Sequence, residues 1–166
     1  MKFTVRVTDA IYDTLEPVAR GLGMVMLELT VFQHKGRGGS SGSVQVRVAI
    51  YKAGENIGVD DCSRFHKAIL PRLELAYPGK DLYLEVSSPG IGRLIKDGNE
   101  MVHFIGRSIK CYTALNNATA LQNADGGGWI GGILCSADEK GITLETGDGI
   151  IALSYEVIAK AKLENI

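Results

Sequence analysis

The residues LEVSSPGIGR at positions 84–93 decide the domain organisation that we expect for this chain. The first four alternate apolar and polar side chains, which is typical of a β-strand. Pro89 and Gly90 then favour a type II turn, because proline fixes its own φ and glycine accepts a positive one. We therefore expect a stiff turn between two dissimilar halves, with one domain at residues 1–91 and a second at residues 92–166.

The N-terminal half has the apolar spacing of an α/β domain in the order α-β-β-α-β. Alternating apolar residues predict strands at residues 24–33, 44–52 and 81–87. Helical spacing predicts one helix at residues 8–22 and another that begins near Asp60. Pro17 favours a kink or a late start in the first helix, and Pro71 favours a bend or an end in the second.

The C-terminal half changes to short strands separated by glycine turns. A short helix is expected at residues 97–105, and strands are expected at 108–114, 128–137, 141–146, 149–154 and 158–163. Five short strands in this length predict a small SH3-like or Sm-like β-barrel. Residues 116–128 would form a loop that projects from it. The predicted fold class is thus α+β, with an N-terminal α/β domain followed by the barrel.

Charge is nearly balanced over the whole chain, with a formal net charge of −1. Residues 1–90 sum to +1 and residues 91–166 sum to −2. Strong free-standing binding to RNA or DNA is disfavoured, because phosphate neutralisation usually requires a clear basic excess. A local basic patch is compatible with these sums, and Arg93, Lys96, Arg107 and Lys110 are its candidate members. The mildly acidic second half suits a basic protein partner.

The remaining composition predicts a cytoplasmic protein that does not enter a membrane. No apolar run approaches the roughly 18 residues of a membrane span, and the start of the chain lacks the apolar core of a secretory signal. The three cysteines are few, odd in number and far apart, which does not suggest a disulfide framework.

Three matches to catalytic or cofactor motifs lack the structural context that the chemistry needs. GGSSG at residues 38–42 fits GxSxG but lies between two strands, whereas a nucleophile elbow joins a strand to a helix. GGGWIG at residues 126–131 fits GxGxxG, yet a strand pattern follows where a phosphate-binding helix is required. Cys62 and His66 share a helix face, but no second pair completes a zinc site. We therefore expect no enzyme activity, catalytic residue, metal, cofactor or small-molecule substrate.

Two groups of residues have both a structural and a functional interpretation. Asp60 and Asp61 favour capping of the second helix, and they could also contact a partner. Trp129 is compatible with either an exposed contact or a core position in the barrel.

Four segments resemble the bacterial ribosome maturation factor RimP family. They are YLEVSSPG at residues 83–90, IGVDDC at 57–62, GWIGGIL at 128–134 and IALSYEVIAKAKL at 151–163. Their order and spacing agree from about residue 8 to residue 164, and the first two together are the most specific. The family usually has Asp and then Arg-Pro after the turn, where this chain has Gly92, Arg93 and Leu94.

The resemblance implies a cytoplasmic assembly factor that binds the immature small ribosomal subunit without catalysis. It implies help with rRNA folding and with docking of a basic small-subunit ribosomal protein near the decoding centre. The residues we expect at the contact are Asp60, Asp61, Ser87, Ser88, Pro89, Gly90 and Arg93. For Ser88 and the turn, locking of the domain junction is the competing interpretation. An RNA-binding regulator with an Sm-like barrel and a small hydrolase built around Ser40 are the rival functions.

Overall fold

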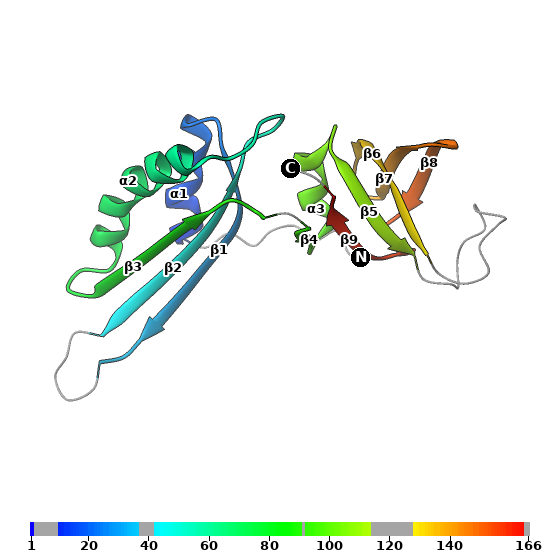
Figure 1. The fold of residues 1–166 in the computed structure, drawn as a ribbon. Helices are drawn as coiled ribbons and strands as arrows, with labels where there is room; N and C mark the ends of the chain where they lie inside the picture. The colour runs from blue at the N-terminus through cyan, green and yellow to red at the C-terminus, as the bar shows by residue number, and fades with distance from the viewer. Residues whose placement is uncertain (2–9, 37–41, 91, 114–127, 165–166) are drawn as a thin grey trace. The chain divides into compact units, whose positions relative to one another are not determined.

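The computed structural model describes residues 1, 10–36, 42–90, 92–113 and 128–164 of the 166-residue chain (Figure 1). It divides into two compact units, Val7–Pro89 and a second that combines Met1–Arg6 with Gly90–Ile166. Residues 116–127 of the predicted 116–128 loop and most of the GxSxG match, including Ser40, lie outside the described residues.

The N-terminal unit is a three-stranded sheet covered on one face by two helices (Figure 1). The elements follow the predicted order: α1 (Ala10–Gly21), β1 (Val25–His34), β2 (Ser43–Tyr51), α2 (Val59–Ala76) and β3 (Asp81–Ser87). In space the order is β1-β2-β3, with β1 antiparallel and β3 parallel to the central β2. Helix α2 is the crossover that joins the parallel pair, as such strands require.

The core of this unit forms where the apolar face of β2 meets the two helices. Alternate residues of β2 point to the helices because strand side chains alternate between faces. The buried set comprises Leu15, Ala19, Met24, Met26, Val44, Val46, Val48, Ile50, Phe65, Ile69 and Leu73. Three of these, on α2, are fully buried, and they explain why Pro71 does not end the helix. Packing of this stripe outweighs the backbone hydrogen bond that a proline removes.

The C-terminal unit is a six-stranded antiparallel sheet in the order β4-β9-β5-β6-β7-β8. It contains β4 (Leu94–Ile95), α3 (Gly98–Met101), the 3-10 helix η1 (Val102–Phe104), β5 (Ser108–Thr113), β6 (Trp129–Ala137), β7 (Gly141–Thr146), β8 (Gly149–Ser154) and β9 (Ile158–Leu163). The α+β class is therefore confirmed, with an antiparallel sheet in the second half. The SH3-like or Sm-like barrel is not confirmed, because the described strands end at β4 and β8 without pairing that closes the sheet.

Two details of this unit concern the element that follows the glycine-rich match and a strand that the sequence analysis did not predict. The glycine-rich match at residues 126–131 runs into β6, so a strand follows it and not a phosphate-binding helix. Strand β4 was not predicted, because two residues are too few to show a period, and it exists through pairing with β9.

Candidate functional site

Asp61 lies at the N-terminus of α2 in the centre of a charge cluster. Its carboxylate accepts hydrogen bonds from the backbone N–H of Gly58 at 3.1 Å, from Lys52 Nζ at 2.8 Å and from Arg64 at 2.6 Å. The side chain is 12% exposed, so these contacts form away from most of the solvent. Lys52, the Gly58 amide and Arg64 lower the pKa of Asp61 well below its usual range. The cluster fixes the loop between β2 and α2.

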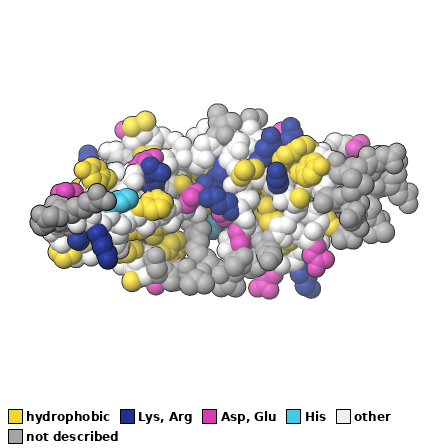
Figure 2. Space-filling model, turned by 90° about the horizontal axis from the view of Figure 1, so that it is seen from below, with side chains coloured by type: hydrophobic (Ala, Val, Ile, Leu, Met, Phe, Trp, Pro, Cys, Tyr) yellow, Lys and Arg dark blue, Asp and Glu magenta, His cyan; other side chains and the backbone are white. Residues whose placement is uncertain are grey.

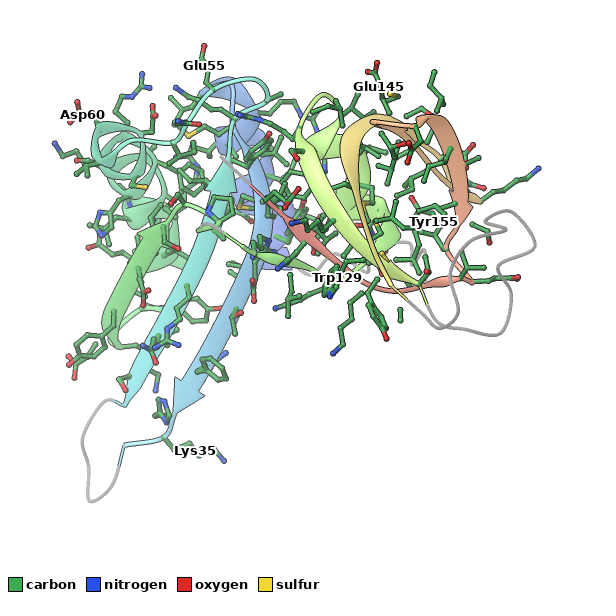
Figure 3. The ribbon with its side chains drawn as sticks, turned by 45° about the vertical axis from the view of Figure 1, so that its right-hand side comes forward. Lys35, Glu55, Asp60, Trp129, Glu145 and Tyr155 are labelled. Atoms are coloured by element: carbon green, nitrogen blue, oxygen red, sulfur yellow. The ribbon has the colours of Figure 1, made fainter. Side chains whose placement is uncertain are left out.

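Asp60 differs from its neighbour in that its side chain is exposed. It points outward from the first turn of α2 (Figure 3). A carboxylate at this place interacts favourably with the helix dipole and is also accessible to a partner. Of the predicted acidic pair, Asp60 is therefore the member whose side chain is exposed to solvent.

Ser87 ends β3, and the residues of the predicted turn follow it directly. Ser87 and Ser88 are exposed, and Pro89 is half-buried. Gly90 has a φ of +74°, the left-handed conformation that a type II turn needs at its third residue. The predicted backbone conformation of this glycine is thus confirmed.

The fold brings Asp60, Asp61 and Ser87 to the same end of the N-terminal sheet. Strands β2 and β3 are parallel, so their carboxyl ends lie at one edge. Helix α2 begins after the end of β2, and the turn begins after the end of β3. Two sequence segments that are 26 residues apart therefore meet at this edge through strand pairing.

Arg93 belongs to the C-terminal unit, where its side chain is buried against α3. Its guanidinium lies 3.3 Å from Glu100 Oε2, and the two side chains are 9% and 6% exposed. Arg93 directly precedes β4, and its backbone carbonyl accepts a hydrogen bond from the N–H of Leu163, the last residue of β9. Arg93 therefore links β9 and α3 within this unit.

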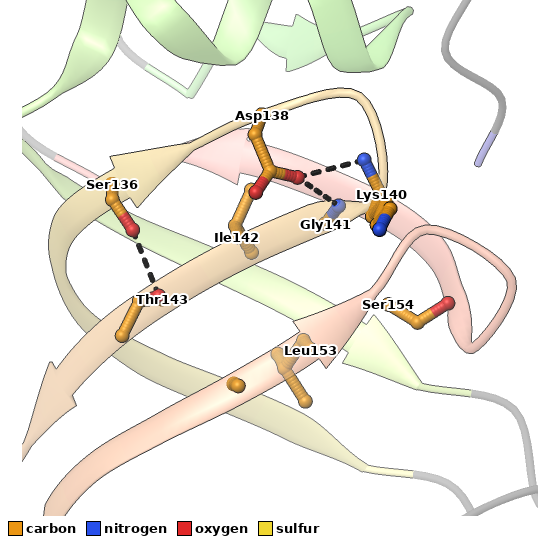
Figure 4. Close-up of a pocket in the computed structure, with 9 residues that line it drawn as sticks. Ser136, Asp138, Lys140, Gly141, Ile142, Thr143, Leu153 and Ser154 are labelled. Atoms are coloured by element: carbon orange, nitrogen blue, oxygen red, sulfur yellow. Dashed lines mark hydrogen bonds between the residues drawn. The ribbon is translucent and has the colours of Figure 1, made fainter.

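A shallow hollow of about 260 Å³ lies beside the turn between β6 and β7 (Figure 4). Asp138 points into this turn and accepts hydrogen bonds from the backbone N–H groups of Lys140 and Gly141, at 2.7 and 3.0 Å. These two bonds lower the pKa of Asp138. Ser136 donates to Thr143 at 2.8 Å on the neighbouring strand. These polar groups are engaged in forming the turn and the β6–β7 pair.

The outer face of β5, β6 and β9 carries lysines and aromatic residues that the sequence analysis did not group together. We call it the lysine–tryptophan face and define it by Lys110, Tyr112, Trp129, Lys160 and Lys162. Strand pairing sets Tyr112 opposite both Trp129 and Lys160, and sets Lys110 opposite Lys162. Figure 2 shows Lys and Arg side chains gathered beside hydrophobic ones over this unit. In the sequence, the alternation of lysine and apolar residues at positions 160–163 was the available signal for this face. Only the pairing of β5 with β9 shows which residues of β5 lie opposite these lysines.

The described residues contain no group of three or more His, Cys, Asp or Glu side chains that could hold a metal ion. None of the described helices has the length and apolar character needed to span a membrane. The fold is therefore that of an α+β protein with two units. The polar side chains described above take part in turns, in the first turn of a helix and in ion pairs.

Comparison with known proteins identifies the family. The RimP N-terminal domain model matches residues 14–92. The protein named ribosome maturation factor RimP from Borrelia turicatae is 30% identical over 153 residues, which cover 92% of this chain and 93% of that protein. Its namesake from Borrelia hermsii is 30% identical over 161 residues, covering 96% and 99%. The chain therefore belongs to the RimP family, which confirms the resemblance found in its sequence.

Proposed function

We propose that this protein is a ribosome maturation factor that binds the immature small ribosomal subunit. It assists rRNA folding and the docking of a basic small-subunit ribosomal protein near the decoding centre, in the cytoplasm and without catalysing a reaction. The similarity to relatives named ribosome maturation factor RimP, over more than nine-tenths of the chain, carries this proposal. No cofactor or small-molecule substrate takes part.

The edge formed by the ends of β2 and β3 is the proposed contact in the N-terminal unit. Asp60, Ser87 and Ser88 are exposed there and present a carboxylate and two hydroxyl groups. Asp61 supports this edge from beneath through its ion pairs. Pro89 and Gly90 direct the chain out of the edge. The carboxylate favours a basic protein segment, since charge complementarity governs orientation and association rate.

Arg93 contributes to the proposed contact indirectly. Its pairing with Glu100 holds β4, β9 and α3 in place, so it supports the C-terminal unit that follows the turn.

The function can be tested by gradient sedimentation of lysates from bacterial cells that accumulate small-subunit precursors and contain the tagged protein. We expect tagged protein to move with the precursor fraction and to leave it when mature subunits replace the precursors. A protein that stays at the top of the gradient under both conditions would contradict the proposal. Repeating the gradient at two salt concentrations separates protein-mediated contact from phosphate-driven contact, because only the latter weakens steeply with salt.

Asp60→Lys tests the proposed edge, and Lys67→Ala is its control on the same helix. Both side chains are exposed, so neither change disturbs the core. We expect Asp60→Lys to reduce the precursor-bound fraction severalfold and Lys67→Ala to leave it unchanged. Equal binding by both variants would remove Asp60 from the contact while leaving the function itself in place.

An RNA-binding regulator is the second candidate function, and the lysine–tryptophan face is the observation that favours it. It predicts tight, salt-sensitive binding to naked RNA in the absence of any ribosomal particle. The near-neutral net charge of −1 argues for the particle-bound role.

A further inference from the structure

The lysine–tryptophan face combines a cationic surface with an exposed aromatic ring. Trp129 is 47% exposed, and its ring centroid lies 5.5 Å from that of Tyr112 at an interplanar angle of 59°. The ammonium of Lys162 lies 4.9 Å from the centre of the Trp129 ring. Tilted rings and a cation over a ring are both favourable geometries, so the tryptophan is held in a defined position at the surface.

Positive charge on this face exceeds negative charge, although the C-terminal half as a whole is acidic. The three lysines of the face come from β5 and β9, and its acidic neighbours are Glu164, after β9, and Glu145 of β7, which pairs with Ile133 of β6. Glu164 forms an ion pair with Lys110 and accepts a hydrogen bond from Ser108 at 3.2 Å. Lys160 and Lys162 therefore supply positive charge beside the ring in addition to the Lys110–Glu164 pair.

Gly131 follows Trp129 on the same face of β6 and has no side chain of its own. Gly131 stands opposite Lys110, and a Cβ there would approach the Lys110 side chain and Glu164 to 3.4 Å. The Lys110 and Glu164 side chains therefore lie over Gly131, and they place an ammonium and a carboxylate next to the position of Trp129 on β6. A base that stacks on the exposed ring would take the place of the Lys162 ammonium, which with Lys160 could then reach the backbone that carries the base.

We propose that the lysine–tryptophan face binds single-stranded RNA. One base stacks on Trp129, Tyr112 flanks it, and Lys160 and Lys162 contact phosphates on either side. Aromatic stacking tolerates any base, and lysines in a row follow a flexible phosphate backbone. An acidic peptide would use the lysines but would leave the tryptophan exposed, so the geometry favours a nucleic acid over a protein here.

This inference rests on the proposed function and deepens it by naming a surface and its partner. The balanced charge of the rest of the chain keeps binding to free RNA weak. The face then acts on an unfolded rRNA segment once other contacts hold the protein on its particle, since a tethered site works at a raised effective concentration.

Intrinsic fluorescence gives a direct test, because the chain contains one tryptophan and it lies on this face. The probe is a single-stranded oligouridylate of about ten nucleotides, titrated into the full-length protein at several salt concentrations. We expect quenching that saturates and that weakens with salt, with a slope of about −0.7 per phosphate contact in a plot of log affinity against log salt.

Lys160→Ala combined with Lys162→Ala is the decisive variant, and Lys67→Ala combined with Lys140→Ala is its matched control. All four positions lie on helix, strand or turn surfaces outside the core. The first double variant should reduce the salt slope by about 1.4, whereas the control should keep the slope of the unchanged protein. Trp129→Ala, followed by anisotropy of labelled RNA, should lower the affinity about tenfold.

Absence of quenching, or equal quenching by oligoglutamate or by duplex RNA, would overturn the proposal. So would an unchanged salt slope in the Lys160 and Lys162 double variant. These results are distinct from failure of the proposed function, since the sedimentation assay can still place the protein on precursor particles. Conversely, RNA quenching by a protein that never sediments with precursors would support this surface and contradict the ribosomal role.

Discussion

Two arginine–glutamate pairs of nearly equal length occupy different environments in the two units. Arg93 and Glu100 in the C-terminal unit are 3.3 Å apart, and Arg47 and Glu85 on the N-terminal sheet are 3.2 Å apart. The first pair is 9% and 6% exposed, whereas the second is 55% and 61% exposed. Distance therefore does not distinguish the pairs, but exposure to solvent does.

The difference in exposure changes what each pair does for the protein. Water screens the exposed pair on β2 and β3, so this pair contributes little to stability. Burial makes removal of one partner costly in the Arg93–Glu100 pair, because the remaining charge loses an opposite charge in a poorly solvated place. Asp61 with Lys52 and Arg64 lies between these extremes, at 12%, 18% and 58% exposure.

The largest expected effect is that of Arg93→Ala. We expect it to lower the free energy of unfolding of the C-terminal unit by about 3–5 kcal/mol, since Glu100 would remain buried without this guanidinium. Hydrogen exchange of β5 and β9 amides should measure the loss, because it reports on one unit of a two-unit chain.

Arg93→Met combined with Glu100→Leu provides the control for this prediction. Replacing both members of a buried pair with apolar side chains of similar size is often neutral, so the double variant should recover much of the lost stability. A loss below about 1 kcal/mol for Arg93→Ala would mean that the pair is solvated like an exposed one, and the contrast with Arg47 would disappear.

The Asp61 cluster provides the intermediate case, and its effect should depend on pH. The pKa of Asp61 is lower in the folded protein than its ordinary value of 3.8. The ionised side chain therefore stabilises the fold at pH values above 3.8, and this contribution is progressively lost as the pH falls below that value. Asp61→Asn should therefore be less stable than the unchanged protein near pH 7. Urea unfolding at a series of pH values should show the difference shrinking below about pH 4.

Asp60→Asn is the matched control at the adjacent position. Its exposed side chain lies in the same helical turn, so both variants lose one negative charge near the helix N-terminus. A loss for Asp61→Asn no larger than that for Asp60→Asn, at every pH, would show that the bonds to Lys52 and Arg64 add nothing beyond the helix dipole.

The order and type of most elements could be predicted from sequence because their periodicity is local. Strand β3, for example, was expected at residues 81–87 and is observed as Asp81–Ser87. Pro71 was misleading, because the buried stripe of α2 outweighs its helix-breaking tendency. Closure of a barrel could not be inferred from strand count alone, since closure depends on pairing between the first and last strands.

The candidate site shows the same division between local and non-local information. The positive φ of Gly90 follows from its own turn and was predicted. The burial of Arg93 depends on Glu100 facing it, and the lysine–tryptophan face depends on β5 pairing with both β6 and β9. Summed charge could not reveal that face, because Lys110 and Lys162 are 52 residues apart in the chain and meet only through the sheet.

The smallest expected effect concerns the exposed pair of Arg47 and Glu85. A double-mutant cycle with Arg47→Ala and Glu85→Ala should give a coupling free energy of about 0.2–1 kcal/mol. That coupling should decrease in 1 M salt, where the screening length falls to about 3 Å. A coupling free energy above about 2 kcal/mol that did not decrease with salt would show that this face is shielded from solvent. The Arg47–Glu85 pair would then behave like the buried Arg93–Glu100 pair. A small, salt-sensitive value would instead establish that burial, and not contact distance, separates the two pairs.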